Sequence, residues 1–198
     1  KMDLAQLLYR GQYFLGQKKI DLPKWQHALL GSTGWLSTHP DLNCVQVKEN
    51  GFTVILLGFI LDPDRPSDDD RSILQRLCLG STDADAFIRS TETLGGRWLI
   101  FVEGHGADLV FNDAGGTQTL FYHVDAKGHV WMATQPGLLA EQLGFVESKE
   151  SIEYTNSPRF KERHEAWWPG ECSPYTEVKQ LLPNHLFDFQ TKTVKRYW

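Results

Sequence analysis

Two segments in the middle of the chain are apolar on both alternating sets of positions. They are residues 52–57, which read Phe-Thr-Val-Ile-Leu-Leu, and residues 97–102, which read Arg-Trp-Leu-Ile-Phe-Val. Successive side chains of a β-strand point to opposite faces of the sheet, so a strand of this composition has two largely apolar faces. We therefore expect both segments to be strands that are covered on both sides.

Short connections between apolar segments predict antiparallel hairpins. The connections contain glycine or polar residues, as in Glu103-Gly104-His105-Gly106 and Asp125-Ala126-Lys127-Gly128. The paired segments are 98–102 with 109–111, 120–123 with 130–133, and 186–189 with 194–198. Links this short join neighbouring antiparallel strands rather than the parallel strands of a crossover unit.

Two further segments have the spacing of apolar residues that is typical of helices. Residues 71–79 carry Ile73, Leu74 and Leu77, and residues 83–94 carry Ala84, Phe87, Ile88 and Thr91. Only residues 80–82 separate them, so we expect the two helices to be neighbours in one outer layer. Antiparallel sheets that are buried on both faces need helices outside them. The pattern thus predicts an α+β fold, a four-layer αββα sandwich of two antiparallel sheets.

The rest of the chain is less regular. Residues 1–50 indicate one or two strands, because Gly31, Gly34 and the turn at 38–41 interrupt any long helix. Residues 145–174 indicate a loop excursion, which is polar as far as Glu165 and then reads Trp167-Trp168-Pro169-Gly170. The two tryptophans either fold back on the core or form a docking patch, since Trp is enriched at interaction hot spots.

Composition limits the classes of function. A chain of 198 residues that is 41% hydrophobic can bury one full core, so we expect a single domain over residues 1–198. A net charge of −5 gives no electrostatic footprint for nucleic acid or for an anionic membrane. The apolar run at 4–8 is too short for a signal peptide or a span. Three cysteines without paired spacing indicate reduced thiols and a cytoplasmic location.

One stretch resembles a known family. Asn112-Asp113, Gly116 and Leu120-Phe121 are followed by residues 131–135 and then by Pro136-Gly137-Leu138-Leu139. This order is similar to the amino-terminal glutaminase domain of asparagine synthetases, where Arg-Asp, a glycine turn, a Pro-Leu-Tyr strand and a short helix succeed one another. The resemblance continues upstream to residues 52–59 and downstream to 181–185, where the family has a Leu-Pro-Pro-Gly-His-like turn. It covers residues 52–198 and also implies the αββα fold of amino-terminal-nucleophile hydrolases.

The residues with which that family performs its chemistry are missing. Its nucleophile is an amino-terminal cysteine whose own α-amine serves as the base, whereas this chain begins Lys1-Met2-Asp3. By the resemblance, Leu57 stands where an asparagine supplies an oxyanion donor, and the loss of one such donor costs roughly 3 to 4 kcal/mol of transition-state stabilisation. Trp35 stands near the position of the arginine that binds the glutamine carboxylate. We therefore assign no catalytic residue.

The cysteines leave one alternative open. Of Cys44, Cys78 and Cys172, only Cys44 is early enough in the chain to become an amino-terminal nucleophile after cleavage. The chain would then be an active amidohydrolase or glutamine amidotransferase of the amino-terminal-nucleophile type, matured by cleavage before Cys44. A buried or loop cysteine is the other interpretation.

Three further motifs have plain structural interpretations. Ser67-Asp68 resembles the family's pair that holds the glutamine amine, but the run 67–70 also fits the cap and first turn of a helix. Residues 114–119 resemble the ATP pyrophosphate loop of the synthetase half, without its first Ser and its Asp, and fit a turn between strands. The seven histidines have no metal-ligand spacing, so we assign no metal site.

These observations predict a catalytically inactive glutaminase-like domain of an asparagine-synthetase-related protein. The parent activity implied by the resemblance is ATP-dependent amide formation. We expect no cofactor in this chain, because ATP and Mg²⁺ would belong to a synthetase domain that lies outside it. The expected partner is a synthetase-like domain in cis or in trans, or a second copy of the chain. The predicted docking surfaces are Trp167-Trp168 and Tyr197-Trp198.

Overall fold

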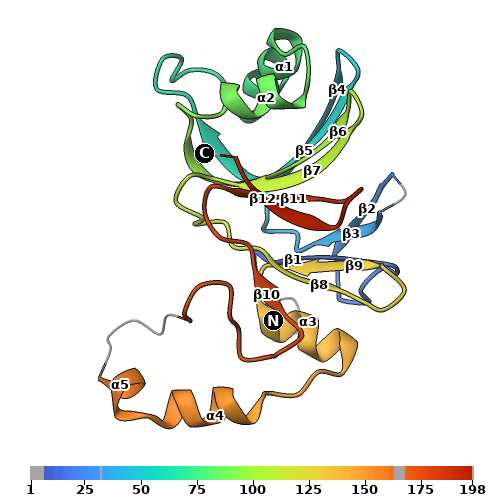
Figure 1. Cartoon of the computed structure of the whole chain (residues 1–198). Helices are drawn as coiled ribbons and strands as arrows, with labels where there is room; N and C mark the ends of the chain where they lie inside the picture. Colours follow the sequence, from blue (N-terminus) through green and yellow to red (C-terminus); the bar gives the residue numbers. More distant parts are fainter. Residues whose placement is uncertain (1–6, 32, 163–167, 198) are drawn as a thin grey trace. The chain divides into compact units, whose positions relative to one another are not determined.

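The computed structural model describes residues 7–31, 33–162 and 168–197 (Figure 1). These residues form two compact units, and each unit is assembled from separate stretches of sequence. The first comprises residues 1–39 and 120–182, and the second comprises residues 40–119 and 183–198. Each unit contains one six-stranded sheet. Lys1-Met2-Asp3, Trp167 and Trp198 lie outside the described residues.

The first sheet belongs to the first unit and is antiparallel at every neighbouring pair. Its strand order is β10 (Lys179–Gln180), β8 (Phe121–Val124), β9 (Val130–Ala133), β1 (Tyr13–Gly16), β3 (Gly34–Thr38) and β2 (Gln26–Leu30). Helix α3 (Pro136–Leu143) covers one face, where its Leu138 and Leu139 pack with Phe14 and Val178. The short helix that follows the second predicted hairpin is therefore present.

The second sheet belongs to the second unit and is also antiparallel throughout. Its order is β12 (Thr193–Arg196), β11 (His185–Asp188), β7 (Ala107–Asn112), β6 (Gly95–Gly104), β5 (Phe52–Leu61) and β4 (Cys44–Glu49). All three predicted hairpins are confirmed. The β6–β7 turn consists of His105 and Gly106, both with positive φ, as a two-residue hairpin turn that follows the twist of its strands requires.

Helices α1 (Asp70–Gly80) and α2 (Ala84–Ser90) pack against one face of the second sheet. Leu74 and Leu77 of α1 and Phe87 of α2 share an apolar cluster with residues of β5 and β6. The prediction that the two helices lie in one layer is confirmed, although α2 is four residues shorter than expected at its carboxyl end. Asp69 caps α1 and Asp83 caps α2, each through a hydrogen bond of 2.8 Å from a backbone amide.

Strands β5 and β6 are buried on both faces, as the sequence predicts. Val54 and Leu56 belong to the cluster beneath α1 and α2, and the alternating residues Ile55 and Leu57 on the opposite face are also fully buried. The structure is therefore α+β, with two antiparallel six-stranded sheets and few helices. None of the described helices is long and apolar enough to cross a lipid bilayer.

Two parts of the chain contain more regular structure than predicted. The described residues of the stretch 1–50 form four strands, β1 to β4, rather than one or two. The excursion at 145–174 contains α4 (Lys149–Asn156) and α5 (Pro158–Lys161) instead of loop alone. These two helices begin at serine caps, since the hydroxyls of Ser148 and Ser157 accept hydrogen bonds from the amides of Ser151 and Phe160.

Candidate functional site

The position that corresponds by resemblance to the family's oxyanion donors is Leu57-Gly58 in β5. Leu57 is fully buried and brings no hydrogen-bond donor. Gly58 has a φ of +100°, and its N–H donates to the Asn43 carbonyl oxygen at 2.9 Å. One of the two groups that would face a developing oxyanion is thus absent, and the other is already engaged.

Asn43 ties this part of β5 to the start of α1. Its Nδ2 donates to the Gly58 carbonyl oxygen and to Asp70 Oδ2, each at 2.8 Å. The other carboxylate oxygen of Asp70 accepts a hydrogen bond of 2.8 Å from the Ile60 amide. The polar groups around Gly58 therefore satisfy one another, which is typical of a structural network.

Cys44 lies at the start of β4, directly opposite Leu57 in the strand register. The residue has exposed surface and a free thiol, but desolvation by the surrounding protein raises the pKa of this thiol above its ordinary value. A cysteine nucleophile requires the opposite change, because the thiolate is the reactive form. The sequence before Cys44 also supplies β1, β2 and β3, which make up half of the first sheet.

The other two positions suggested by the resemblance have structural partners. Trp35 lies in β3 of the first sheet, and the Lys19 ammonium stands 4.1 Å from its ring centroid. Asp68 forms an ion pair with Arg76, at 3.8 Å between Oδ2 and Nε. The residue that caps α1 is Asp69, so the interpretation of residues 67–70 as a helix start is confirmed.

Asp113 organises the turn that the sequence compares with an ATP-binding loop. Its buried carboxylate accepts hydrogen bonds from the backbone amides of Gly115, Thr117 and Gln118, at 3.2, 3.0 and 2.9 Å. The Thr117 hydroxyl and the Trp98 amide donate to it as well. A phosphate would need these amides for itself, so the interpretation of residues 114–119 as a turn is confirmed.

The predicted docking residues that the structure describes pack within the chain. The Tyr197 ring meets Phe111 edge-on, and burial, with the nearby charge of Asp113, raises the pKa of Tyr197 to about 12. Trp168 is half-buried against Tyr154, with ring centroids 5.4 Å apart, and against Phe160 at 6.3 Å. Trp168 thus folds back on the α4–α5 excursion rather than on the apolar cluster under α3.

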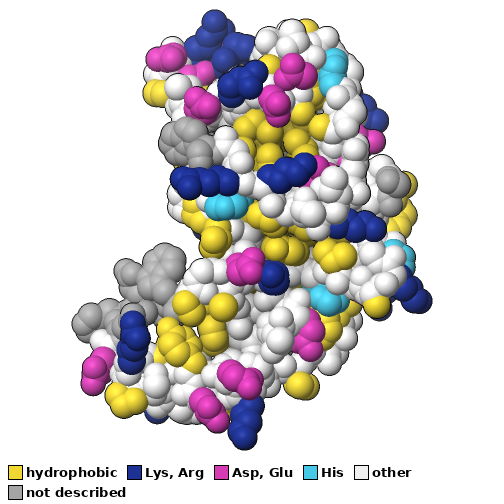
Figure 2. Space-filling model, viewed as in Figure 1, with side chains coloured by type: hydrophobic (Ala, Val, Ile, Leu, Met, Phe, Trp, Pro, Cys, Tyr) yellow, Lys and Arg dark blue, Asp and Glu magenta, His cyan; other side chains and the backbone are white. Residues whose placement is uncertain are grey.

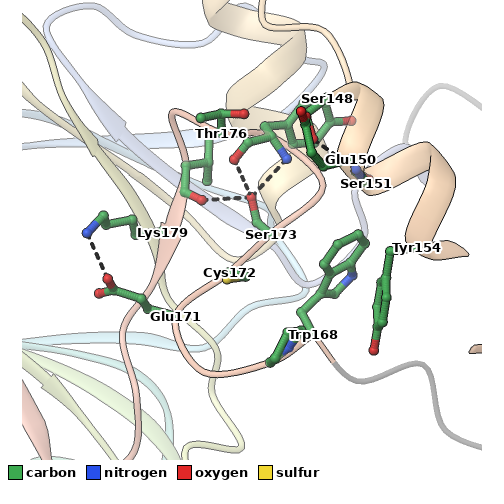
Figure 3. Close-up of a pocket in the computed structure, with 13 residues that line it drawn as sticks. Ser148, Glu150, Ser151, Tyr154, Trp168, Glu171, Cys172, Ser173, Thr176 and Lys179 are labelled. Atoms are coloured by element: carbon green, nitrogen blue, oxygen red, sulfur yellow. Dashed lines mark hydrogen bonds and ion pairs between the residues drawn. The ribbon is translucent and has the colours of Figure 1, made fainter.

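A pocket of about 640 Å³ opens between α4 and the segment 168–179, within the first unit (Figure 3). Trp168, Tyr154, Tyr175 and Val178 supply its apolar walls. Its other lining residues are Ser148, Glu150, Ser151, Pro169, Glu171, Cys172, Ser173, Thr176 and Lys179. Figure 2 shows hydrophobic side chains gathered in this lower part of the view, where Figure 1 draws α4 and the segment that leads to β10.

Hydrogen bonds hold the wall of the pocket that faces α4. The buried Ser173 hydroxyl lies 2.7 Å from the Val178 carbonyl oxygen and 2.9 Å from that of Tyr175, and it accepts from the Tyr175 amide at 3.1 Å. The Ser148 amide donates to the Pro174 carbonyl oxygen at 3.0 Å, which fastens α4 to this segment. The pocket thus has a built frame rather than two surfaces that only lie near each other.

One ion pair lies at the edge of the pocket. Lys179 Nζ is 2.8 Å from Glu171 Oε1, and this hydrogen bond raises the pKa of Lys179. No local sequence pattern predicts the pocket, because its walls come from α4 and from residues about twenty positions further along the chain. The aromatic pair Trp167-Trp168 is the sequence signal in this region, and it fits either core packing or a docking surface.

The His, Cys, Asp and Glu side chains of the described residues do not gather into a candidate metal site. Within residues 7–31, 33–162 and 168–197, no three His, Cys, Asp or Glu side chains come together in a way that could hold a metal ion. Cys78 is buried, and this burial raises the pKa of its thiol to about 11.

Comparison with known proteins adds no family assignment. No protein-family model matches the chain, and no curated protein is significantly similar to it. The resemblance to asparagine synthetases therefore rests on the residues quoted for it, and the function that it implies is a proposal.

Proposed function

We propose that this chain is a catalytically silent glutaminase-like domain of an asparagine-synthetase-related protein. The observation that carries the proposal concerns Leu57-Gly58. Leu57 brings no oxyanion donor, and the Gly58 N–H already donates a hydrogen bond to the Asn43 carbonyl oxygen. Two antiparallel sheets with helices on one face of each, and the short helix α3 after the β8–β9 hairpin, support the family part of the proposal. ATP-dependent amide formation would belong to a synthetase-like domain.

We also propose that the two sheets stack face to face in the αββα order. In the first sheet, Phe14 faces α3, while its neighbours Tyr13 and Leu15 are fully buried on the other face. In the second sheet, Ile55 and Leu57 are buried on the face away from α1 and α2. A crystal structure in which some other element covers either of these faces would contradict this arrangement.

The alternative, maturation by cleavage before Cys44, meets a structural obstacle. Cleavage there would separate β1, β2 and β3 from the rest of the chain, and β1 is a central strand that pairs with both β9 and β3. It would also detach Tyr13, Phe14 and Leu15, all of which are fully buried. An active form would have to retain the released segment non-covalently.

We expect the purified chain to release no ammonia from glutamine above background. Leu57→Asn should not restore turnover, because an oxyanion donor stabilises only a transition state that some nucleophile has generated. The measurement is a coupled ammonia assay on the wild type, Leu57→Asn and Cys44→Ala, with intact-mass analysis of each protein. Turnover that disappears in Cys44→Ala, together with a loss of 43 residues from the intact mass, would establish the alternative instead.

We propose that a synthetase-like domain, or a second copy, covers the apolar surface at the end of β5. Phe59 and Leu61 lie two positions apart and are 47% and 58% exposed. Leu61 also lines a second pocket of about 440 Å³, together with Pro63 and Pro66 and with the acidic residues Asp62 and Asp68. Apolar patches beyond a few hundred Å² are uncommon on monomers.

Studied alone, the chain should therefore self-associate through this surface. Light scattering should show that the Phe59→Ser, Leu61→Ser double variant is monomeric at concentrations where the wild type associates. Leu79→Ser is the control, because Leu79 is 63% exposed and lies on α1, outside this surface. Monodisperse monomers for all three proteins would contradict self-association.

A further inference from the structure

Three aromatic residues, Tyr154, Trp168 and Tyr175, line the α4 pocket. Trp168 and Tyr154 stand side by side (Figure 3), and Tyr175 lines the pocket from the segment 168–179. The face of an aromatic ring carries partial negative charge, so it attracts a cation that lies within about 6 Å of its centre. Trp is the strongest of the aromatic residues in this respect.

The charged side chains at the pocket also favour a cation. Glu171 is neutralised by its ion pair with Lys179. Glu150 lines the same pocket from the first turn of α4, and within the described part of the chain no hydrogen bond or ion pair engages its carboxylate. The charged lining residues, Glu150, Glu171 and Lys179, therefore leave one uncompensated negative charge.

The size of the pocket also fits a small organic ligand. A volume of about 640 Å³ lies within the range of roughly 300 to 1,000 Å³ that ligand pockets have, and a mostly apolar lining with a few polar groups is usual for them. The hydroxyls of Ser148 and Ser173 are engaged in the frame of the pocket. Recognition by charge therefore falls to Glu150 and to the rings.

We propose that this pocket binds an organic cation, namely an ammonium compound with an apolar body. The apolar body lies against Trp168, Tyr175 and Val178, and the charged nitrogen lies between the aromatic faces and the Glu150 carboxylate. An anionic ligand of the same size should bind more weakly, because it would lie beside the aromatic rings and the Glu150 carboxylate. The site lies within the first unit, and its binding does not depend on whether the chain is glutaminase-like.

The test uses three probes of similar size on the full chain: benzyltrimethylammonium, the neutral benzyl alcohol and the anionic phenylacetate. Isothermal titration calorimetry or NMR titration should give the tightest binding for the cation and the weakest for phenylacetate. Trp168→Leu should weaken cation binding by roughly 2- to 30-fold, which is the range of a cation–π contact. The affinity for benzyl alcohol should change less.

Glu150→Gln gives a second variant that does not depend on the packing of an aromatic residue. It should weaken binding of the cation several-fold, with little effect on benzyl alcohol, and added salt should reduce the difference from the wild type. Glu153→Gln is the matched control, because Glu153 lies on the same helix, carries the same charge and does not line the pocket. Equal affinity for the cation and benzyl alcohol, or equal effects of Glu150→Gln and Glu153→Gln, would overturn the proposal.

Discussion

Gly58→Ala should destabilise the protein by about 4 kcal/mol or more, a large part of the 5 to 15 kcal/mol that folded domains usually have. Gly58 has a φ of +100°, a conformation that L side chains rarely adopt. A Cβ at this position would lie 2.1 Å from the Arg97 carbonyl oxygen on the neighbouring strand. Because that oxygen belongs to the backbone of β6, either strand β5 or β6 would have to shift.

Gly80→Ala is the matched control for this substitution. Gly80 ends α1, has no left-handed φ, and has open space where its Cβ would be. Replacing a helical glycine by alanine costs nothing sterically and stabilises a helix by up to about 1 kcal/mol. Urea unfolding of both variants should show a large decrease in the free energy of unfolding for Gly58→Ala and a small increase for Gly80→Ala. Equal stabilities would show that the strand tolerates a side chain at Gly58.

The reason why position 58 must be glycine bears on the proposed function. Gly58 is required by the backbone itself, through its φ and its close approach to β6. Leu57 beside it is fully buried and opposes Leu99 in the register. A glycine at this position therefore needs no catalytic explanation, and its presence beside Leu57 is consistent with a strand that keeps its shape without an oxyanion site.

Strands and helices with strong apolar patterns could be predicted from the sequence. Residues 52–57 and 98–102 are apolar on both alternating sets of positions, and the structure buries both sets. The β4–β5 hairpin was missed although the sequence carries its signal. Asn50 and Gly51 both have positive φ and form its two-residue turn, and Asn-Gly is the preferred pair for such a turn.

Helix α4 could not be predicted from hydrophobic periodicity. Its only buried residue is Ser151, so it has no apolar stripe to detect. The serine caps and the contacts of Tyr154 with Phe160 and Trp168 hold it instead. The pocket is formed by those contacts between residues that are distant in the sequence, so no local motif predicts it.

Asp113→Ala should destabilise the second unit by about 3 to 5 kcal/mol, because it would leave several buried backbone amides without an acceptor. The carboxylate accepts from Gly115, Thr117 and Gln118, and also from Trp98 on β6 at 3.3 Å. Asp113→Asn should reduce the stability less, because the amide keeps one acceptor oxygen. It should still reduce it, because the amide nitrogen is a donor that would face other donors.

The matched comparison is Asp125→Ala in the β8–β9 turn. The Asp125 carboxylate also accepts several hydrogen bonds, from the amides of Lys127 and His129 and from the Trp131 indole. It is more exposed than Asp113, so water can replace it as the acceptor when it is removed. Chemical unfolding should therefore show a clearly smaller decrease in the free energy of unfolding for Asp125→Ala than for Asp113→Ala. If the two losses were equal, the number of hydrogen bonds rather than burial would set the cost, and the Asp113 turn would have no special part in holding β6 and β7 together.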